Sequence, residues 1–248
     1  MKLSVIIPAH NEAACVTKTV AAIAEILEHE KIAYEIILVD DHSMDATSTI
    51  VHHLSANNKN ILVFNNQYLP GFGYAVRFGI EKASGDCVAI MMADLSDSAK
   101  DLVTFYRTML QGNYDCVFGS RFVKGGEAHD YPVVKLLINR MANFFIRTAF
   151  WIKYNDTTNA FKLYKRQTLE GLKPFLSNHF NLTIELPLKA IIRGYSYTIV
   201  PNTWQNRKEG ISKLKIREMG SRYFFIVLYC LIEKYFSVND YRKKQISL

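Results

Sequence analysis

The 248-residue chain is poor in cysteine, glycine and proline, and it has no long hydrophobic run. Its four cysteines form no C-x-x-C pair, which excludes a disulfide framework and a zinc site. Twelve glycines and six prolines are too few for a collagen-like chain or a flexible linker. Hydrophobic residues make up 49% and charged residues 21% of the sequence, which excludes a disordered chain. We therefore expect a globular, intracellular protein with reduced cysteines and one large or two small domains.

The sequence also lacks the features of an exported or membrane-spanning protein. Met1 and Lys2 lead directly into a short apolar run that ends at Pro8, so we expect no signal peptide. The longest uncharged apolar stretch in the C-terminal part, residues 223–232, is far shorter than the ~20 residues that a spanning helix needs. We predict a cytoplasmic protein that does not cross a membrane but can lie on its surface.

Charge is divided unevenly between the two halves of the chain. Residues 1–120 contain 8 Lys and Arg against 14 Asp and Glu, a net charge of −6, whereas residues 121–248 contain 22 against 9, a net charge of +13. A basic surface of this kind suits a phosphate group or an anionic membrane. Nucleic acid is the alternative ligand, but no helix-turn-helix, zinc-finger or RNP-type pattern accompanies the charge. We therefore predict no nucleic-acid binding.

Short apolar runs alternate with longer amphipathic stretches in the first half of the chain. The runs are rich in Val and Ile and predict buried strands at 3–8, 35–39, 61–65, 87–91 and 116–119. Helical spacing of apolar residues predicts helices at 12–28, 45–57, 74–83 and 97–111. This alternation predicts an α/β fold with a mainly parallel central sheet and ligands beyond the carboxyl ends of its strands.

The pattern changes after about residue 120. Residues 133–152 and 216–236 are long apolar helix candidates with interspersed Lys and Arg, and a helix at 182–193 and a strand at 195–201 lie between them. Mixed apolar and basic helices suit an anionic membrane surface, although aromatic residues at helical spacing are also common in a core. We predict one domain over 1–217, followed over 218–248 by an amphipathic helix and basic tail that associate with a membrane.

Acidic residues follow two of the predicted strands. Asp40 and Asp41 end the second strand, and adjacent carboxylates there need a cation, a ribose or a base amine as a partner. Residues 94–97 (Asp-Leu-Ser-Asp) follow the fourth strand and offer oxygen atoms of the kind that hold Mg²⁺ together with substrate phosphates. Helix capping is the alternative role for Asp45 and Asp97. The sequence therefore predicts a polar ligand site at this edge of the sheet.

These pieces occur in the order found in one known family. The sequence contains PAHNE (8–12), VDDHSMDAT (39–47), GFGYAVRFG (71–79), ASGD (83–86), ADLS (93–96) and GSR (119–121). These segments resemble the motifs of the family 2 glycosyltransferases, which have the GT-A fold, a Rossmann-like three-layer sandwich. RKEGISKL (207–214) narrows the resemblance to the polyprenyl-phosphate sugar transferases, the group that includes dolichol-phosphate mannose synthase. The resemblance runs from residue 3 to about residue 217.

The resemblance implies a site for a nucleoside-diphosphate sugar and a divalent ion. The donor would contact Pro8, His10, Glu12, Val39, Asp41, Arg77, Ala93, Asp94 and Ser96, and an Mg²⁺ or Mn²⁺ ion would be held by Asp94, Ser96 and Asp97. The chain departs from the family pattern at His10, where Tyr is usual, and at Met92, which replaces the first Asp of Asp-x-Asp. Asn159 and Ala160 replace a Ser/Thr-Gly pair, which indicates either an altered sugar pocket or a neutral change in a turn.

The resemblance also implies a cationic site for an acceptor phosphate. Its residues would be Arg121, Lys135, Arg207, Ser212 and Lys213. Lys135 stands where the family more often has Arg, whose planar fork matches a phosphate better than a lysine does. We expect Asp94, Arg121 and Arg207 to contribute most to catalysis. A solvated surface charge is the alternative for each of these basic residues and for Arg77.

The reaction implied by the resemblance is the inverting, metal-assisted transfer of a sugar from a GDP-mannose or UDP-hexose type donor to dolichyl or undecaprenyl phosphate. A phosphate monoester is largely ionised at neutral pH, so it needs no general base, and the sequence shows no Ser-His-Asp set. One alternative is transfer to a glycan hydroxyl, which would need a base such as Asp97. The other is a non-catalytic nucleotide-sugar-binding relative. The predicted location is the cytoplasmic face of a membrane, with a membrane-anchoring partner protein left open.

Overall fold

The central sheet has seven strands in the computed structural model, which describes residues 1–206 and 216–243 and, within these, every side chain except those of 216–219. The strands are β1 (Leu3–Ala9), β2 (Tyr34–Asp40), β3 (Ile61–Asn65), β4 (Cys87–Ile90), β5 (Cys116–Ser120), β7 (Lys162–Lys165) and β8 (Tyr197–Pro201). They lie in the order β3-β2-β1-β4-β7-β5-β8. Strand β7 is antiparallel to β4 and β5, and the other neighbours are parallel. The predicted mainly parallel sheet is confirmed.

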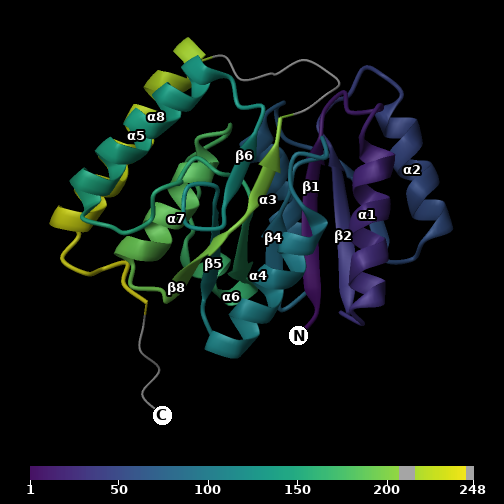
Figure 1. Cartoon of the computed structure of the whole chain (residues 1–248), viewed down its shortest axis with the longest axis horizontal. Coiled ribbons are helices and arrows are strands. Elements are labelled where there is room, and N and C mark those ends of the chain that lie inside the picture. Colours follow the sequence, from purple (N-terminus) through teal and green to yellow (C-terminus); the bar gives the residue numbers. More distant parts are fainter. Residues whose placement is uncertain (207–215, 244–248) are drawn as a thin grey trace.

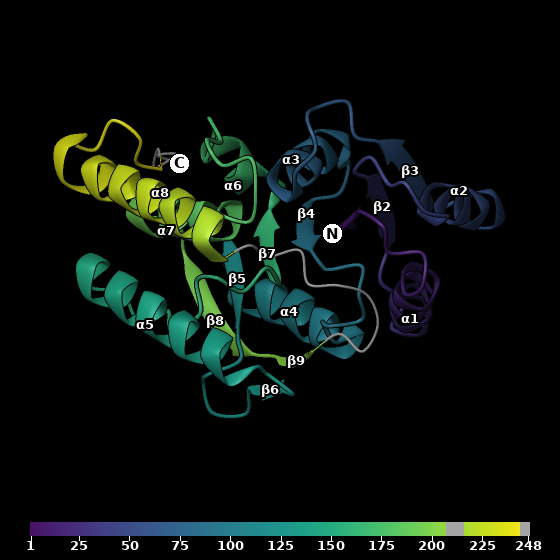
Figure 2. The same cartoon turned by 90° about the horizontal axis from the view of Figure 1, so that it is seen from above.

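Helices cover both faces of this sheet (Figure 1 and Figure 2). One face carries α1 (Val16–His29), α2 (Thr47–Asn57) and α4 (Ala99–Gly112), and the other carries α3 (Phe72–Lys82), α6 (Arg166–Gly171) and α7 (Leu182–Ile192). Alternate residues of a strand point to opposite faces, so Val5 and Ile7 join the first apolar cluster and Ile6 joins the second. Burial on both faces explains the unbroken apolar runs in the sequence. The predicted three-layer α/β arrangement is confirmed.

The parallel register brings several strand ends to one edge of the sheet. Ala9 at the end of β1 pairs with Asp40 at the end of β2, and Asp40 pairs with Asn65 at the end of β3. Ile90 at the end of β4 pairs with Ile6 in β1. The loops that follow these strands carry most of the predicted polar site residues, so the register gathers them at one edge.

The second half of the chain adds a pair of helices at the rim of the sheet. Helices α5 (Val133–Phe150) and α8 (Ile216–Phe236) lie side by side next to α7 (Figure 2). All three contribute to one buried apolar cluster, with Ile146 from α5, Leu188 from α7 and Val227 from α8. Arg193, which follows α7, forms a buried two-bond ion pair with Glu233 of α8, with N–O distances of 2.6 and 2.9 Å. Helix α8 is therefore anchored on α7.

The helices that the structure describes differ from membrane-spanning helices in length or in apolar character. A spanning helix needs ~20 predominantly apolar residues. Within residues 1–206 and 216–243, no helix combines the length and the apolar character that crossing a membrane requires.

A two-stranded ribbon lies beside the edge that carries the strand ends. It consists of β6 (Glu127–His129) and β9 (Thr203–Gln205), which the sequence patterns do not predict. The backbone N–H of Gln205 donates to the backbone oxygen of Ser96 at 3.0 Å. The N–H of Thr203 donates to the Asp101 carboxylate at 2.7 Å. These bonds fix the ribbon against the turn that follows β4 and the first turn of α4.

Candidate active site

A cavity of ≈ 840 Å³ opens at the strand ends and extends outward between α5 and α8. Nine of the predicted site residues line it: Pro8, His10, Glu12, Asp41, Asp94, Ser96, Asp97, Arg121 and Lys135. They come from the ends of different strands and from α5, which are far apart in the sequence. The fold therefore brings most of the predicted residues together in one space of the size that binds a small molecule.

One wall of the cavity is built around the carboxylate of Asp41, which is 6% exposed. Its Oδ1 accepts a hydrogen bond from Asn66 Nδ2 at 2.7 Å, and its Oδ2 accepts one from the backbone N–H of Gly71 at 2.9 Å. Nδ1 of His10 lies 2.6 Å from the backbone oxygen of Asp41. Asn66 is a supporting residue that the sequence motifs do not single out, although its place directly after β3 is a usable signal.

The N-terminal turn of α3 packs closely against residues 178–179. A Cβ atom on Gly73 would lie 2.5 Å from the carbonyl carbon of Asn178, and one on Gly71 would lie 2.6 Å from its backbone oxygen. Only glycine allows such an approach. Arg77, one turn further along α3, donates from Nη1 to Asn178 Oδ1 at 2.7 Å. Arg77 is thus engaged in this contact and is not among the described residues that line the cavity.

Two other predicted donor residues lie in the core of the described structure instead of on the cavity wall. Val39 is fully buried between β2 and α3 because its position in the strand points it to that face. Ala93 is 2% exposed, and its backbone oxygen accepts a hydrogen bond from Thr19 Oγ1 of α1 at 2.8 Å. Three predicted acceptor-site residues lie outside the described residues: Arg207, Ser212 and Lys213.

The turn after β4 carries the oxygen atoms predicted to hold a divalent ion. Leu95 adopts a left-handed conformation with φ = 60°, and Asp94 Oδ1 accepts the backbone N–H of Ser96 at 3.1 Å. Asp94 is 6% exposed and Ser96 is 3% exposed. Within the described part of the chain, the buried Ser96 hydroxyl has no hydrogen-bond partner. A buried hydroxyl of this kind needs a partner, which an ion or a ligand oxygen at this corner would supply.

Asp97 closes the same corner, beside Met92. Its Oδ2 accepts the backbone N–H of Met92 at 3.1 Å. Burial raises the pKa of the Asp97 carboxyl to about 7; the Met92 N–H acts against this shift and the charge of Asp94 acts with it. Among residues 1–206 and 216–243, no group of three or more His, Cys, Asp or Glu could hold a metal. Asp94, Asp97 and Ser96 instead fit an ion that is completed by substrate phosphates, as Mg²⁺ commonly is.

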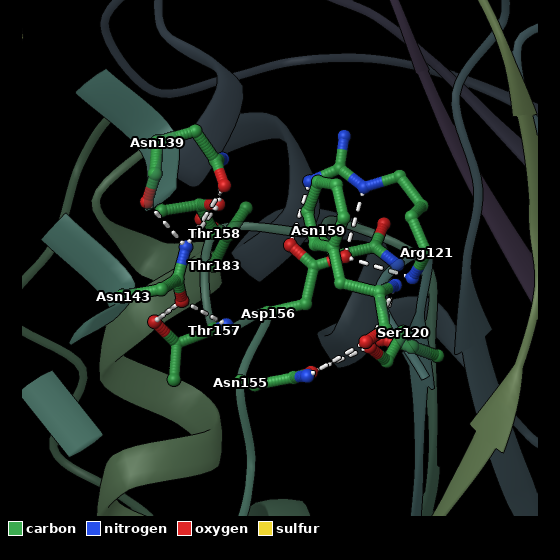
Figure 3. Close-up of polar contacts among 12 residues, drawn as sticks. Ser120, Arg121, Asn139, Asn143, Asn155, Asp156, Thr157, Thr158, Asn159 and Thr183 are labelled. Atoms are coloured by element: carbon green, nitrogen blue, oxygen red, sulfur yellow. Dashed lines mark hydrogen bonds and ion pairs between the residues drawn. The ribbon is translucent and has the colours of Figure 1, made fainter. Parts of the chain in front are cut away.

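Arg121, at the end of β5, is held rigidly at the cavity wall (Figure 3). Its Nε and Nη2 donate to the two carboxylate oxygens of Asp156 at 2.8 and 2.7 Å, and its backbone N–H donates to the same carboxylate at 3.0 Å. Asp156 is fully buried and Arg121 is 7% exposed. Burial alone would lower the pKa of Arg121, but the charge of Asp156 raises it overall, so the guanidinium remains charged.

Aromatic rings surround the same guanidinium. Its central carbon lies 5.3 Å from the ring centre of Phe122, 5.4 Å from Tyr131 and 5.6 Å from Trp204. Arg commonly pairs with ring faces at such distances. Asp156, Tyr131 and Trp204 are site residues that the sequence motifs do not assign. The only sequence signal for Asp156 is that it begins the segment in which Asn159 and Ala160 replace the family's Ser/Thr-Gly pair.

The side chain of Asn159 is engaged in the framework of the site. Its Nδ2 donates to the backbone oxygen of Gly119 at 3.1 Å and to Asn202 Oδ1 at 3.0 Å, and its Oδ1 accepts the N–H of Phe161 at 3.1 Å. The residue is 3% exposed. Asn159 and Ala160 both line the cavity, so both members of this replacement can change the shape of the pocket.

The outer part of the cavity is apolar and is formed by the two rim helices. The lining residues from α5 include Ile138, Ala142, Phe145 and Ile146, and those from α8 include Tyr223, Phe224 and Val227. Arg121 and Lys135 also line the cavity, so charged groups that can bind an anion share one continuous space with an apolar groove.

The chain was compared with known families and proteins. Residues 4–172 match the family described as Glycosyl transferase family 2. A dolichol-phosphate mannosyltransferase from Pyrococcus furiosus is 32% identical over 220 residues, which cover 87% of this chain and 60% of that protein. A polyprenol monophosphomannose synthase from Mycolicibacterium smegmatis is 28% identical over 221 residues, which cover 85% of this chain and 80% of that protein.

Solved structures share the fold. The glucosyl-3-phosphoglycerate synthase from Mycobacterium tuberculosis, in complex with Mn²⁺, uridine diphosphate and phosphoglyceric acid, superimposes with a TM-score of 0.68. The sequence identity is 19%, and the match covers 94% of this chain and 78% of that one. At this identity the likeness concerns the fold alone.

Proposed function

The chain belongs to glycosyl transferase family 2, and from this premise we propose that it transfers a sugar from a nucleoside diphosphate to a polyprenyl phosphate. The observation that carries the proposal is the shape of the cavity. Carboxylates and a buried hydroxyl line its inner part, Arg121 and Lys135 also line it, and an apolar groove between α5 and α8 continues outward. A diphosphate with an ion, a phosphate monoester and an isoprenoid tail need these three environments.

In the proposed reaction an oxygen of the acceptor phosphate attacks the anomeric carbon of the sugar. The bond between that carbon and the diphosphate oxygen breaks, and the nucleoside diphosphate leaves with the electron pair, so the anomeric configuration inverts. Because the acceptor oxygen is already ionised near neutral pH, no protein group must remove a proton from it. The protein's part is to align the two phosphates, since catalysis of such a transfer depends on positioning and on charge.

Each end of the cavity has residues suited to one of these tasks. A bound Mg²⁺ or Mn²⁺ would supply positive charge for the departing diphosphate, and Asp94, Ser96 and Asp97 are the residues that would hold it. Asp41 and Glu12 offer acceptors for the nucleoside. Arg121, fixed by Asp156, offers a charged and oriented group to the acceptor phosphate.

The proposal is tested by presenting the purified chain with GDP-mannose, UDP-glucose and related donors, together with dolichyl or undecaprenyl phosphate and Mn²⁺. We expect one donor to give a glycosyl-lipid phosphate, detected by mass spectrometry. Phosphoglyceric acid and a neutral oligosaccharide serve as competing acceptors. Transfer to either of these with none to lipid phosphate would contradict the proposal. Calorimetric donor binding without transfer to any acceptor would instead favour a non-catalytic relative.

We also propose that the rim helices rest on an anionic membrane, at its cytoplasmic face. Helix α5 exposes Val133 (80%), Met141 (64%) and Phe144 (70%), and α8 exposes Phe225 (59%) and Phe236 (77%). Both helices also form the groove assigned to the lipid tail. An exposed apolar surface continuous with a groove would let the tail pass from the bilayer into the cavity without crossing water.

We expect binding to vesicles to rise with their content of anionic lipid and to fall with salt, because exposed charges are screened beyond ~8–10 Å at moderate ionic strength. Phe144→Glu should weaken sedimentation with vesicles of phosphatidylglycerol and phosphatidylcholine. Leu110→Glu is the matched control, because Leu110 is an exposed apolar residue (43%) on α4, a helix that packs in a different apolar cluster from α5. Equal losses in the two variants, or no sedimentation of the wild type at low salt, would contradict membrane binding through α5.

A further inference from the structure

Helix α5 carries two buried or half-buried asparagines on its inner side. Asn143 is 1% exposed and lies one turn after Asn139 on a helix that is otherwise rich in apolar residues. Asn is a poor helix former, and burying an amide is unfavourable unless its hydrogen bonds are satisfied. A leucine at this position would meet the demands of packing alone. The hydrogen bonds of Asn143 therefore need an explanation.

Those bonds join α5 to the turn that follows Asp156 (Figure 3). Asn143 Oδ1 accepts from the backbone N–H of Thr157 at 2.6 Å and from its hydroxyl at 2.8 Å. Asn143 Nδ2 donates to the backbone oxygen of Asn139 at 3.0 Å and to Thr158 Oγ1 at 3.3 Å. Asn139 Nδ2 also donates to Thr158 Oγ1, at 2.6 Å. Two consecutive threonines are thus fixed to α5.

The same turn is held from its other side by the sheet. Lys162, the first residue of β7, is 1% exposed and donates from Nζ to the backbone oxygen of Thr157 at 3.2 Å. It also donates to the backbone oxygen of Thr183 in α7 at 3.1 Å, and it contacts the backbone oxygen of Asn159. The N–H and C=O of Thr157 are therefore both bound, one by α5 and the other by β7. This leaves the peptide next to Asp156 little freedom to move.

We propose that Asn143 is a positioning residue for the acceptor phosphate: it fixes the turn at Thr157, so that the Asp156 carboxylate holds the Arg121 guanidinium in the orientation that receives the phosphate. The proposal rests on the proposed function, because that function assigns Arg121 to the acceptor. With Asn143 as a positioning residue, the inner side of α5 becomes part of the acceptor site. The helix that lines the lipid groove is then the helix that orients the charge at the end of the groove.

The expected signature is a selective defect in acceptor use. A displacement near 1 Å in a positioning group can lower the rate ~100-fold, so we expect Asn143→Ala to lower kcat/KM for the acceptor at least ~10-fold. Donor affinity, measured by calorimetry with the nucleotide sugar and Mn²⁺, should stay within about twofold, because the side chain of Asn143 bonds to Asn139, Thr157 and Thr158, which belong to α5 and to the turn before β7.

A double-mutant cycle separates this role from general stability. Thr157→Val removes the hydroxyl that donates a hydrogen bond to Asn143, so it should produce part of the same defect in acceptor use. Thr157→Ser keeps this hydroxyl and should retain near wild-type kinetics. The double variant Asn143→Ala with Thr157→Val should be little worse than Asn143→Ala, because both changes remove one interaction. Ser4→Ala is the control, because Ser4 is fully buried and its hydroxyl bonds to Glu35 and Gly85. These residues lie at the N-terminal end of β1, and the cavity lies at its other end. It should lower thermal stability without an acceptor defect.

A readout that does not need turnover keeps this proposal separate from the proposed function. Trp204 lies beside Arg121, and Trp151 is the other tryptophan. In a Trp151→Phe background the emission of Trp204 therefore reports the surroundings of Arg121. We expect Asn143→Ala to shift this emission or its quenching by iodide, and Ser4→Ala to leave both unchanged. If the wild type transfers no sugar to lipid phosphate, the proposed function fails while this shift still tests the positioning. Unchanged emission, or acceptor kinetics equal to those of Ser4→Ala, would overturn it.

Discussion

Asp94→Asn is expected to lower kcat by ~100-fold or more while the protein keeps its thermal stability, because the loss of a carboxylate at the ion site removes electrostatic stabilisation of the leaving diphosphate. Asp94 lies in the turn after β4 and lines the cavity. Its carboxylate accepts the N–H of Ser96, whose buried hydroxyl lies in the same turn. The measurement is initial rate against Mn²⁺ concentration at saturating donor and acceptor. We expect the variant to need more Mn²⁺ as well as to turn over more slowly.

Asp97→Asn and Met92→Asp complete this test. Asp97 accepts the N–H of Met92, and burial raises the pKa of its carboxyl to about 7. We therefore expect Asp97→Asn to lower kcat less than Asp94→Asn does. Met92→Asp restores a carboxylate to the first position of the family motif and should tighten Mn²⁺ binding. Small and equal losses in Asp94→Asn and Asp97→Asn, or no change in Mn²⁺ affinity with Met92→Asp, would show that the ion is held elsewhere.

The first two strands follow closely from local patterns, because both are buried on both faces. Every residue of β1 and β2 is buried, and the apolar runs in the sequence mark both strands. The helix predicted from residue 12 begins only at Val16, and the turn before it is held by a hydrogen bond from the N–H of Glu12 to Thr47 Oγ1 at 2.8 Å. That bond joins segments far apart in the sequence, so no local pattern contains it.

Strand β7 shows what the local patterns do not contain. Its four residues begin with Lys162 and end with Lys165, and the sequence patterns do not predict this strand. Lys162 is buried, and the backbone oxygens of Thr157 and Thr183 accept hydrogen bonds from its Nζ. The strand is also the antiparallel member of the sheet, between β4 and β5. The burial of Lys162 depends on hydrogen-bond partners that lie before and after β7 in the sequence.

Motifs at strand ends predict Asp41, Asp94 and Arg121 as site residues, and the structure places all three on the cavity wall. The donor-phosphate role of Arg77 stays a prediction, and its contact with Asn178, which arises from the packing of α3 against a distant loop, is not contained in any local motif. Asp156, the partner of Arg121, is missed for a related reason. The two residues are 35 positions apart, and only the pairing of β5 with β7 and the turn before β7 bring them together.

Removal of the charge pair itself is expected to have the largest effect on the fold. Arg121→Met leaves the fully buried Asp156 carboxylate without its ion-pair partner, and breaking a buried pair from one side typically lowers the free energy of unfolding by about 3–5 kcal/mol. Transfer to the acceptor should also fall below detection. Chemical denaturation measures the first effect, and the transfer assay measures the second.

The double variant Arg121→Met with Asp156→Leu distinguishes a structural pair from a functional one. Replacing both members of a buried ion pair with apolar residues of similar size is often neutral or stabilising, and the rings of Phe122, Tyr131 and Trp204 already provide apolar surroundings. We therefore expect the double variant to recover most of the lost stability but to remain inactive, with donor affinity within about twofold of the wild type. Stability and transfer that recovered together would mean that the pair only supports the fold. Stability that recovers without transfer would leave Arg121 as the charged group that the acceptor requires.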